Sequence, residues 1–228
     1  MAYKKYIINS LKTLNVRLIK KDIFNDLTVI IIALTNTFET NNLNHQFLTI
    51  EQSKKLKKFS LLDDINNYLI SHSIVNSFFC SYINCRIEDL HYSYNKYFKP
   101  YIKNNDNIKF NISHTLGCSV IALSKNEVGV DIENKKREIE FANVVDSYFN
   151  DYEKLYINNE SDKFYEVWVA KEAYLKCKGC GLMEGLTNLN IVASNKGGFY
   201  LIDENCQTKF KVLIDHIYDR YVIGILGG

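Results

Sequence analysis

Residues 128–133 read Val128-Gly129-Val130-Asp131-Ile132-Glu133, and in this run apolar side chains alternate with glycine and carboxylates. This period of two predicts a β-strand. Asp131 and Glu133 then point to one face of the strand, with their backbones about 7 Å apart. Two carboxylates at that spacing can converge on a hard cation such as Mg²⁺. Taken alone, the pair is better explained as the solvated face of a half-buried strand.

The residues before this run predict two further strands. Apolar side chains alternate with polar ones over 108–113, and Ser119–Ser124 follows as a second strand. The polar residues 125–127 then turn the chain into Val128–Glu133. The sequence therefore predicts a hairpin between Ser119–Ser124 and Val128–Glu133.

Helices are predicted on both sides of this strand-rich centre. The elements expected before it are a strand at 27–34, a lysine-rich helix at 51–59 and a long helix near 61–85. The elements expected after it are helices at 141–148 and 162–178 and strands at 198–202, 210–214 and 221–226. Helices mixed with mostly antiparallel hairpins predict an α+β protein.

The helix at 162–178 carries a second group of reactive side chains. Trp168, Glu172 and Lys176 follow one another at four-residue intervals and so share one face. A glutamate and a lysine at this spacing usually form a surface ion pair worth about 0.3–0.5 kcal/mol. If that face looks into a cleft, Glu172 can bind a metal or act as a general base, and Lys176 can neutralise a phosphate.

A third group is Asn111-Ile112-Ser113-His114-Thr115 at the end of a predicted strand. Adjacent strand residues point to opposite faces, so Ser113 and His114 are poorly placed as a nucleophile and its base. A histidine that hydrogen-bonds a phosphate fits this position better, and a structural histidine fits it nearly as well.

Composition narrows the classes of function. The formal net charge of the 228 residues is +2, which does not favour a nucleic-acid binder. The longest aliphatic run, at 29–34, is far shorter than the roughly 20 residues of a membrane span. No signal-peptide core is evident, which predicts a cytoplasmic protein with six reduced cysteines. The lysines at 54, 55, 57 and 58 are explained by a solvated helix face or by a polyanion that they bind.

Together these groups resemble motifs of the Sfp-type 4'-phosphopantetheinyl transferases. Four segments carry the resemblance: Phe110–Thr115 (F-N-x-S-H-S in the family), Gly129–Glu133 (G-[IV]-D-x-E), Trp168–Lys176 (W-[STC]-x-K-E-[AS]-[FY]-x-K) and Gly179–Leu182 (G-x-G-L). Any one of these motifs is a weak signal. Three in this order are a strong one.

Further segments resemble the family less closely. Tyr97-Phe98-Lys99-Pro100 is similar to Y-G-K-P, and the helix at 51–59, through Lys55, is similar to one that reaches the 3'-phosphate of coenzyme A. Phe149 and Glu153 also match the family. The chain departs from it where Asn67 and Ser71 replace an arginine and a glycine, Gln52 replaces a lysine, Phe98 replaces a glycine and Val169 replaces a small polar residue.

The resemblance implies a fold and a cofactor arrangement. It implies a monomer of two similar α/β halves related by a pseudo-twofold axis, with residues 1–127 as the N-terminal half and 128–228 as the C-terminal half. Coenzyme A is expected to bind between them.

The resemblance also implies roles for individual residues. Asp131, Glu133 and Glu172 would bind Mg²⁺, and Glu172, Lys176 and Asp131 would be catalytic. Lys55, Lys99, Ser113, His114 and Lys176 would bind coenzyme A. The protein would transfer phosphopantetheine to a serine of an apo acyl or peptidyl carrier protein and release 3',5'-ADP.

Two other classes of function stay open from the sequence. One is a metal-dependent phosphohydrolase in which the same three acids activate water. The other is a non-catalytic module that binds coenzyme A or a carrier protein. An apolar stripe of Phe141, Val144, Val145 and Tyr148 is explained best by core packing, although part of it can serve as a carrier-docking surface.

Overall fold

The computed structural model describes residues 18–25, 28–35, 45–137, 140–180, 186–194 and 198–227. The chain packs into two compact units. Unit 1 comprises Met1–Asn95 and Pro100–Lys125, and unit 2 comprises Lys96–Lys99 and Asn126–Gly228. Each unit has its own hydrophobic core and an antiparallel sheet with helices packed on it, which confirms the α+β class.

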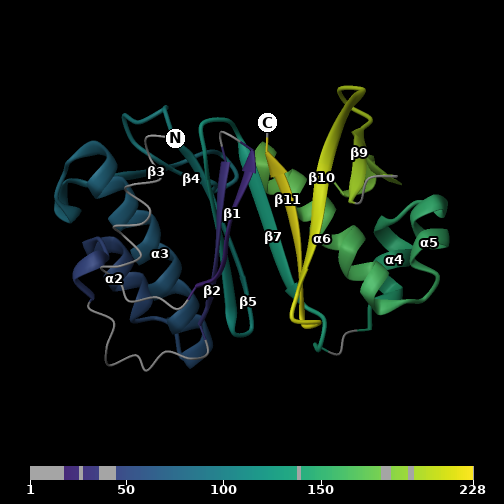
Figure 1. Ribbon diagram of the computed structural model, residues 1–228, viewed down its shortest axis with the longest axis horizontal. Coiled ribbons are helices and arrows are strands. Elements are labelled where there is room, and N and C mark those ends of the chain that lie inside the picture. The colour runs from purple at the N-terminus through teal and green to yellow at the C-terminus, as the bar shows by residue number, and fades with distance from the viewer. Residues whose placement is uncertain are drawn as a thin grey trace. The chain divides into compact units, whose positions relative to one another are not determined.

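Unit 1 is built on a four-stranded sheet in the order β1-β2-β6-β5 (Figure 1). Its strands are β1 (Leu18–Asn25), β2 (Thr28–Leu34), β5 (Lys109–Thr115) and β6 (Cys118–Ser124). The central strands β2 and β6 are buried along almost their whole length, which explains why their sequences are nearly continuous apolar runs. A tight turn containing Gly117, at a left-handed φ of 80°, joins β5 to β6.

The long helix α3 (Leu62–Ile83) packs against β5 and β6. Ile70, Ile74, Phe78 and Tyr82 follow one another at four-residue intervals on one face, and the first three are buried while Tyr82 is partly buried. Helix α2 (Ile50–Leu56) is shorter than predicted and begins with a capping box between Thr49 and Gln52. The remaining elements of unit 1 are short helices at His45–Phe47 and Ile87–Asp89 and a ribbon of β3 (Tyr92–Tyr94) and β4 (Pro100–Ile102).

Unit 2 is built on a five-stranded antiparallel sheet in the order β7-β11-β10-β9-β8. The strands are β7 (Val128–Asn134), β8 (Leu189–Ala193), β9 (Phe199–Asp203), β10 (Thr208–Ile217) and β11 (Tyr221–Gly227). Helix α6 (Ser161–Lys178) lies along β7 and β11 and ends, as predicted, at Gly179, whose φ is 65°. The other helices are α4 (Ala142–Tyr148), α5 (Asp151–Ile157) and a short one at Leu186–Asn188.

The predicted hairpin between Ser119–Ser124 and Val128–Glu133 is wrong. Strand β6 pairs with β2 and β5, whereas β7 pairs with β11 in the other sheet. The polar residues 125–127 lead the chain from one unit to the other. A turn signal shows that the chain changes direction and does not show which strand becomes the partner.

Helix α6 approaches the sheet of unit 2 unusually closely. A Cβ atom added to Gly129 would lie 1.9 Å from the Ala173 carbonyl oxygen, and one added to Gly224 would lie 2.3 Å from the Val169 carbonyl oxygen. Because both obstacles are helix backbone, no side-chain movement can relieve them. The two glycines let α6 rest directly on the backbones of β7 and β11.

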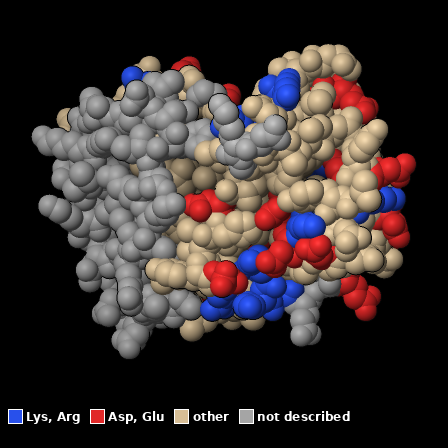
Figure 2. Space-filling view, turned by 45° about the vertical axis from the view of Figure 1, so that its right-hand side comes forward, with Lys and Arg blue, Asp and Glu red and all other residues tan. Residues whose placement is uncertain are grey.

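The surface drawn in Figure 2 carries acidic and basic side chains side by side over its described part. This mixture agrees with the near-neutral net charge of +2. None of the helices that the structure describes is long and apolar enough to cross a membrane.

We predict that Gly129→Ala destabilises the protein severely. The added methyl group must push α6 away from β7, and overpacking against an immovable backbone is expected to cost about 3 kcal/mol or more. Thermal unfolding should show a fall in Tm on the order of 10 °C. The matched control is Ala193→Val, which adds carbon atoms at an exposed position of the same sheet and should leave Tm almost unchanged. Equal Tm values for the two variants would contradict the close approach.

Candidate active site

Asp131 and Lys176 form the centre of the candidate site in unit 2. Asp131 lies on β7 with 4% of its surface exposed, and its Oδ1 accepts a hydrogen bond from Lys176 Nζ on α6 at 2.5 Å. Gly129 and Asp131 lie on the strand face that α6 covers, so this face is buried. The explanation of Asp131 and Glu133 as a solvated face is therefore wrong.

Two further carboxyl groups surround this ion pair. Burial, and next the charge of Asp131, raise the pKa of Glu133 to about 7. The same two causes raise the pKa of Glu172 to about 7, with Lys176 acting in the opposite direction. Burial alone would lower the pKa of Lys176, but Asp131 and the two glutamates raise it overall. Carboxyl groups with a pKa near 7 can accept and release protons near neutral pH.

The donor chemistry of these three acids suits a hard divalent cation. They are all oxygen ligands, Asp131 lies close enough to Glu133 and Glu172 to raise the pKa of both glutamates, and a cation would relieve the repulsion between the three groups. Among the described residues, no group of three or more His, Cys, Asp or Glu side chains has the spacing of a complete metal site. Asp131 is held by Lys176 in this arrangement.

The structure places Ser113 and His114 on opposite faces of β5 in unit 1. Ser113 is 5% exposed and His114 is exposed, which agrees with the argument against a nucleophile–base pair. His114 and Lys55 both lie within electrostatic range of His72, a residue that the sequence did not single out. Burial lowers the pKa of His72 to about 4, the Tyr68 carbonyl opposes this shift, and the charges of Lys55 and His114 add to it.

Lys55 itself is exposed, with its ammonium group 5.3 Å from the centre of the Tyr68 ring. That ring stacks on His72 with 3.9 Å between the ring centres. The neighbouring lysines at 54, 57 and 58 are exposed too, as expected for a solvated helix face.

Lys99 belongs to unit 2 and already holds protein partners there. Its Nζ donates to Glu127 Oε2 at 2.8 Å and to the carbonyl oxygen of Cys177 at 2.7 Å. The second bond satisfies a carbonyl at the C-terminal end of α6. Lys99 thus joins the segment before β7 to the end of α6.

Lys171 is a buried residue whose role the sequence did not reveal. It is 1% exposed, and its Nζ donates to Glu153 Oε2 at 2.7 Å and to the Leu186 carbonyl oxygen at 3.2 Å. Glu153 Oε1 in turn accepts from the backbone nitrogen of Ile191 at 2.9 Å. The pair ties α5, α6 and β8 together. Its traces in the sequence are the matches of Lys171 and Glu153 to the family noted above, which do not reveal that the two residues pair.

The apolar stripe at Phe141, Val144, Val145 and Tyr148 packs against the core of unit 2, and each of its four residues is half-buried. Core packing therefore explains it, as expected. Gly179 and Cys180 are described, whereas Gly181 and Leu182 of the last motif lie outside the described residues.

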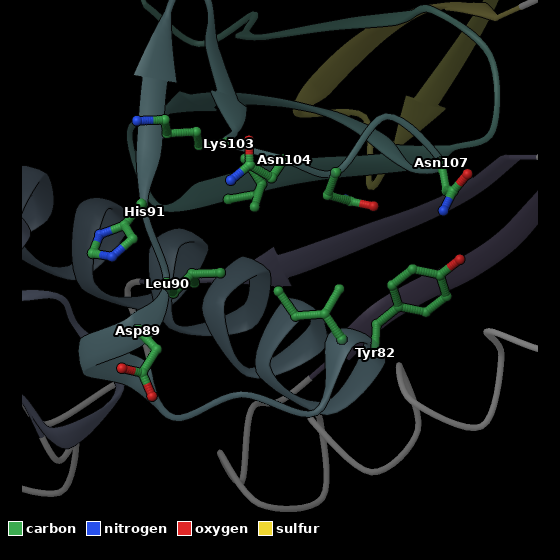
Figure 3. Close-up of a pocket in the computed structure, with 10 residues that line it drawn as sticks. Tyr82, Asp89, Leu90, His91, Lys103, Asn104 and Asn107 are labelled. Atoms are coloured by element: carbon green, nitrogen blue, oxygen red, sulfur yellow. The ribbon is translucent and has the colours of Figure 1, made fainter.

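A pocket of about 500 Å³ in unit 1 lies apart from the predicted site residues (Figure 3). Its lining includes Tyr82, His91, Asn104 and Asn107 and none of the residues predicted to bind coenzyme A or metal. It therefore does not coincide with the candidate active site.

Comparison with known proteins finds one enzyme family over most of the chain. Residues 127–226 match the 4'-phosphopantetheinyl transferase superfamily, and residues 36–126 match the N-terminal part of 4'-phosphopantetheinyl transferase. The chain is 29% identical to the 4'-phosphopantetheinyl transferase ffp of Bacillus subtilis over 67% of this chain and 69% of that protein.

Two further relatives are more distant. The 4'-phosphopantetheinyl transferase Sfp of Bacillus subtilis strain 168 is 26% identical over 67% of this chain and 70% of its own length. The transferase gsp of Aneurinibacillus migulanus is 27% identical over 58% of this chain and 56% of its own length.

We predict that Phe98→Gly stabilises the protein. Phe98 has a φ of 64°, a left-handed conformation that strains a bulky residue, and its side chain is 82% exposed, so little packing is lost. Relief of this strain should raise the free energy of unfolding by about 0.5–1 kcal/mol in denaturant titrations. Phe98→Ala keeps the Cβ atom and separates strain from loss of the ring. A gain as large for alanine as for glycine would refute the backbone explanation.

We also predict that Glu153→Ala strongly destabilises the protein. It leaves the ammonium group of Lys171 buried without its carboxylate, which is expected to cost about 3–5 kcal/mol in denaturant titrations. The control is Glu160→Ala, which removes a half-exposed partner of Lys163 and should cost less than about 1 kcal/mol. If both variants lowered the free energy of unfolding by similar amounts, the buried Lys171–Glu153 pair would contribute no more to stability than an exposed pair.

Proposed function

The chain belongs to the 4'-phosphopantetheinyl transferase superfamily, and we propose that it transfers 4'-phosphopantetheine from coenzyme A to a serine of an apo acyl or peptidyl carrier protein. The observation that carries this proposal is the ion pair between the buried Asp131 and the partly exposed Lys176, flanked by Glu133 and Glu172. These residues come from the two motifs, on β7 and α6, that resemble the family most closely. The close approach of α6 to β7 fixes their backbones.

The three acids are the proposed Mg²⁺ ligands. Asp131, Glu133 and Glu172 offer carboxylate oxygens, and binding of a cation would stabilise the charged forms of Glu133 and Glu172. Bound Mg²⁺ would supply charge stabilisation for the phosphoryl group during transfer. Lys176 neutralises Asp131 in this arrangement, and its ammonium group would also neutralise the phosphates of coenzyme A.

The chemical step assigns one role to each of two residues. Glu172 accepts the proton of the carrier serine as the serine oxygen forms its bond to the phosphorus of the phosphopantetheine arm. The bond from that phosphorus to the oxygen of 3',5'-ADP breaks in the same transfer, and Lys176 neutralises the charge on the leaving group. Burial and the charge of Asp131 raise the pKa of Glu172 to about 7 in the cation-free site. Binding of a cation would lower this pKa and so keep Glu172 in the carboxylate form that accepts the proton.

The proposed contacts to coenzyme A use residues of both units. In unit 1, Lys55 and His114 supply charge for phosphate groups, and Ser113 is the proposed contact to the adenosine part. In unit 2, Lys176 and Lys99 are the proposed phosphate ligands. Lys99 already donates to Glu127 and to the Cys177 carbonyl, so a phosphate would compete with these two partners for its ammonium group.

Neither alternative class of function finds support in the comparisons. The stretches 36–126 and 127–226 both match transferase descriptions, whereas nothing in them points to a phosphohydrolase or to a non-catalytic binding module. The monomeric state, the cytoplasmic location and the division at residue 127 stay predictions from the sequence.

We predict that Asp131→Ala abolishes transfer without unfolding the protein. The variant removes the carboxylate at the centre of the site, while β7 and α6 keep their backbone contact. Intact mass spectrometry of an apo carrier protein incubated with coenzyme A and Mg²⁺ should show the gain of one phosphopantetheine with the unaltered protein only. EDTA should suppress this gain.

Asp146→Ala, at an exposed aspartate of unit 2, is the control and should transfer normally. Full activity of Asp131→Ala at an ordinary concentration of Mg²⁺ would contradict the assignment of Asp131 as a metal ligand. Cleavage of coenzyme A without modification of the carrier would favour the hydrolase.

A further inference from the structure

Asn67 on α3 uses its whole hydrogen-bonding capacity inside unit 1. Its Oδ1 accepts from Thr35 Oγ1 at 2.7 Å and from Ser119 Oγ at 3.0 Å. Its Nδ2 donates to Asp63 Oδ2 at 3.0 Å and to the carbonyl oxygen of Thr115 at 3.0 Å. A carboxylate and a carbonyl can only accept, so the surroundings fix which way the amide points. The residue is 1% exposed.

These bonds converge on the turn between β5 and β6. Thr115 is the last residue of β5, and Ser119 lies at the start of β6. The backbone nitrogen of Gly117, inside the turn, donates to Asp63 Oδ1 at 2.9 Å. Its carbonyl oxygen accepts from the backbone nitrogen of Thr35 at 3.0 Å. Asn67 and Asp63 thus bind both arms of the turn and its centre to α3.

The clamped turn directly follows Ser113 and His114. These two residues precede Thr115 on β5, so the position of their backbone depends on the end of the strand that Asn67 holds. We propose that Asn67 is a positioning residue that orients Ser113 and His114 for coenzyme A. The proposal rests on the proposed function, which makes these two residues ligands of coenzyme A.

This role gives a physical meaning to a departure from the family. The resemblance places an arginine at position 67, where this chain has Asn67. An arginine there would keep Asp63 as an ion partner, but it has no acceptor for the hydroxyl groups of Thr35 and Ser119. It would also bring a larger, charged side chain into a site that is 1% exposed. In this chain, Asn67 holds β5, β6 and the residue that follows β2 to α3 through its hydrogen bonds.

Ser71, which replaces the family's glycine, also forms its side-chain hydrogen bond inside unit 1. Ser71 Oγ donates to the Asn67 carbonyl oxygen at 2.7 Å, one turn back along α3. The hydroxyl group is thus satisfied within the helix. Position 71 adds a local bond where the family has a glycine.

The test combines substitutions at Asn67 with a matched neighbour. Asn67→Ala and Asn67→Arg should each weaken coenzyme A binding about tenfold or more in calorimetry, because several buried partners lose their bonds. In steady-state assays the KM for coenzyme A should rise while kcat changes little. Hydrogen exchange of the amides at 113–118 should become faster. Restoring the family residue is thus expected to reduce affinity.

Asn66→Ala is the control because Asn66 is the adjacent asparagine of α3 and is 3% exposed, with an Oδ1 that has no partner among the described residues. The Asn66→Ala variant should bind coenzyme A with the affinity of the unaltered protein, and its amides at 113–118 should exchange hydrogen at the same rate. If Asn67→Ala does not fold, Asp63→Ala removes the same clamp from a half-buried position and should give the same pattern.

The outcomes separate the two levels of the proposal. Unchanged affinity and unchanged exchange in Asn67→Ala, or tighter binding in Asn67→Arg, would overturn the positioning role while leaving the proposed function standing. Absence of coenzyme A binding by the unaltered protein would overturn the proposed function and the positioning role with it. An equal loss of affinity in Asn66→Ala would show a general effect of destabilising α3 and would also overturn the positioning role.

Discussion

The backbone contact between α6 and the strands β7 and β11 is the constraint on which unit 2 depends. It exists because Gly129 and Gly224 have no side chains at the points where the helix crosses the strands. With the helix this close, Asp131 on β7 and Lys176 on α6 meet at hydrogen-bond distance. The burial that results also raises the pKa of Glu133 and Glu172. One packing contact thus sets both the geometry and the electrostatics of the candidate site.

The same region shows how a protein can hold an unfavourable charge arrangement. Three acids in a buried place repel one another, and Lys176 offsets only part of that repulsion. The stability needed to hold them comes from elsewhere in the unit, including the Lys171–Glu153 pair and the apolar core around α6. A site of this kind is suited to a divalent cation, since the cation removes the electrostatic cost and can then attract a phosphate group.

Local patterns in the sequence predicted what depends on neighbouring residues. The strand at β7, the long helices and the stop at Gly179 follow from periodicity and capping, and the structure contains them. Strand pairing does not follow from local pattern, which is why β7 was assigned to the wrong partner. The roles of Asn67 and Lys171 could not be predicted either, because they depend on partners up to 52 and 23 residues away. Burial of the Asp131 face needed the same long-range information.

The excursion of Lys96–Lys99 has a consequence for how the chain can be divided. The residues on both sides of it belong to unit 1, whereas Lys99 bonds to Glu127 and Cys177 in unit 2. Each unit has its own core, yet no single cut releases both of them whole. If the gene were divided near residue 126, the first fragment would carry Lys96–Lys99, which pack with unit 2. The second fragment would lack Lys99, which bonds to the C-terminal end of α6. The two units have separate cores, but each is made of two segments of the chain, so cutting the chain once cannot separate them intact.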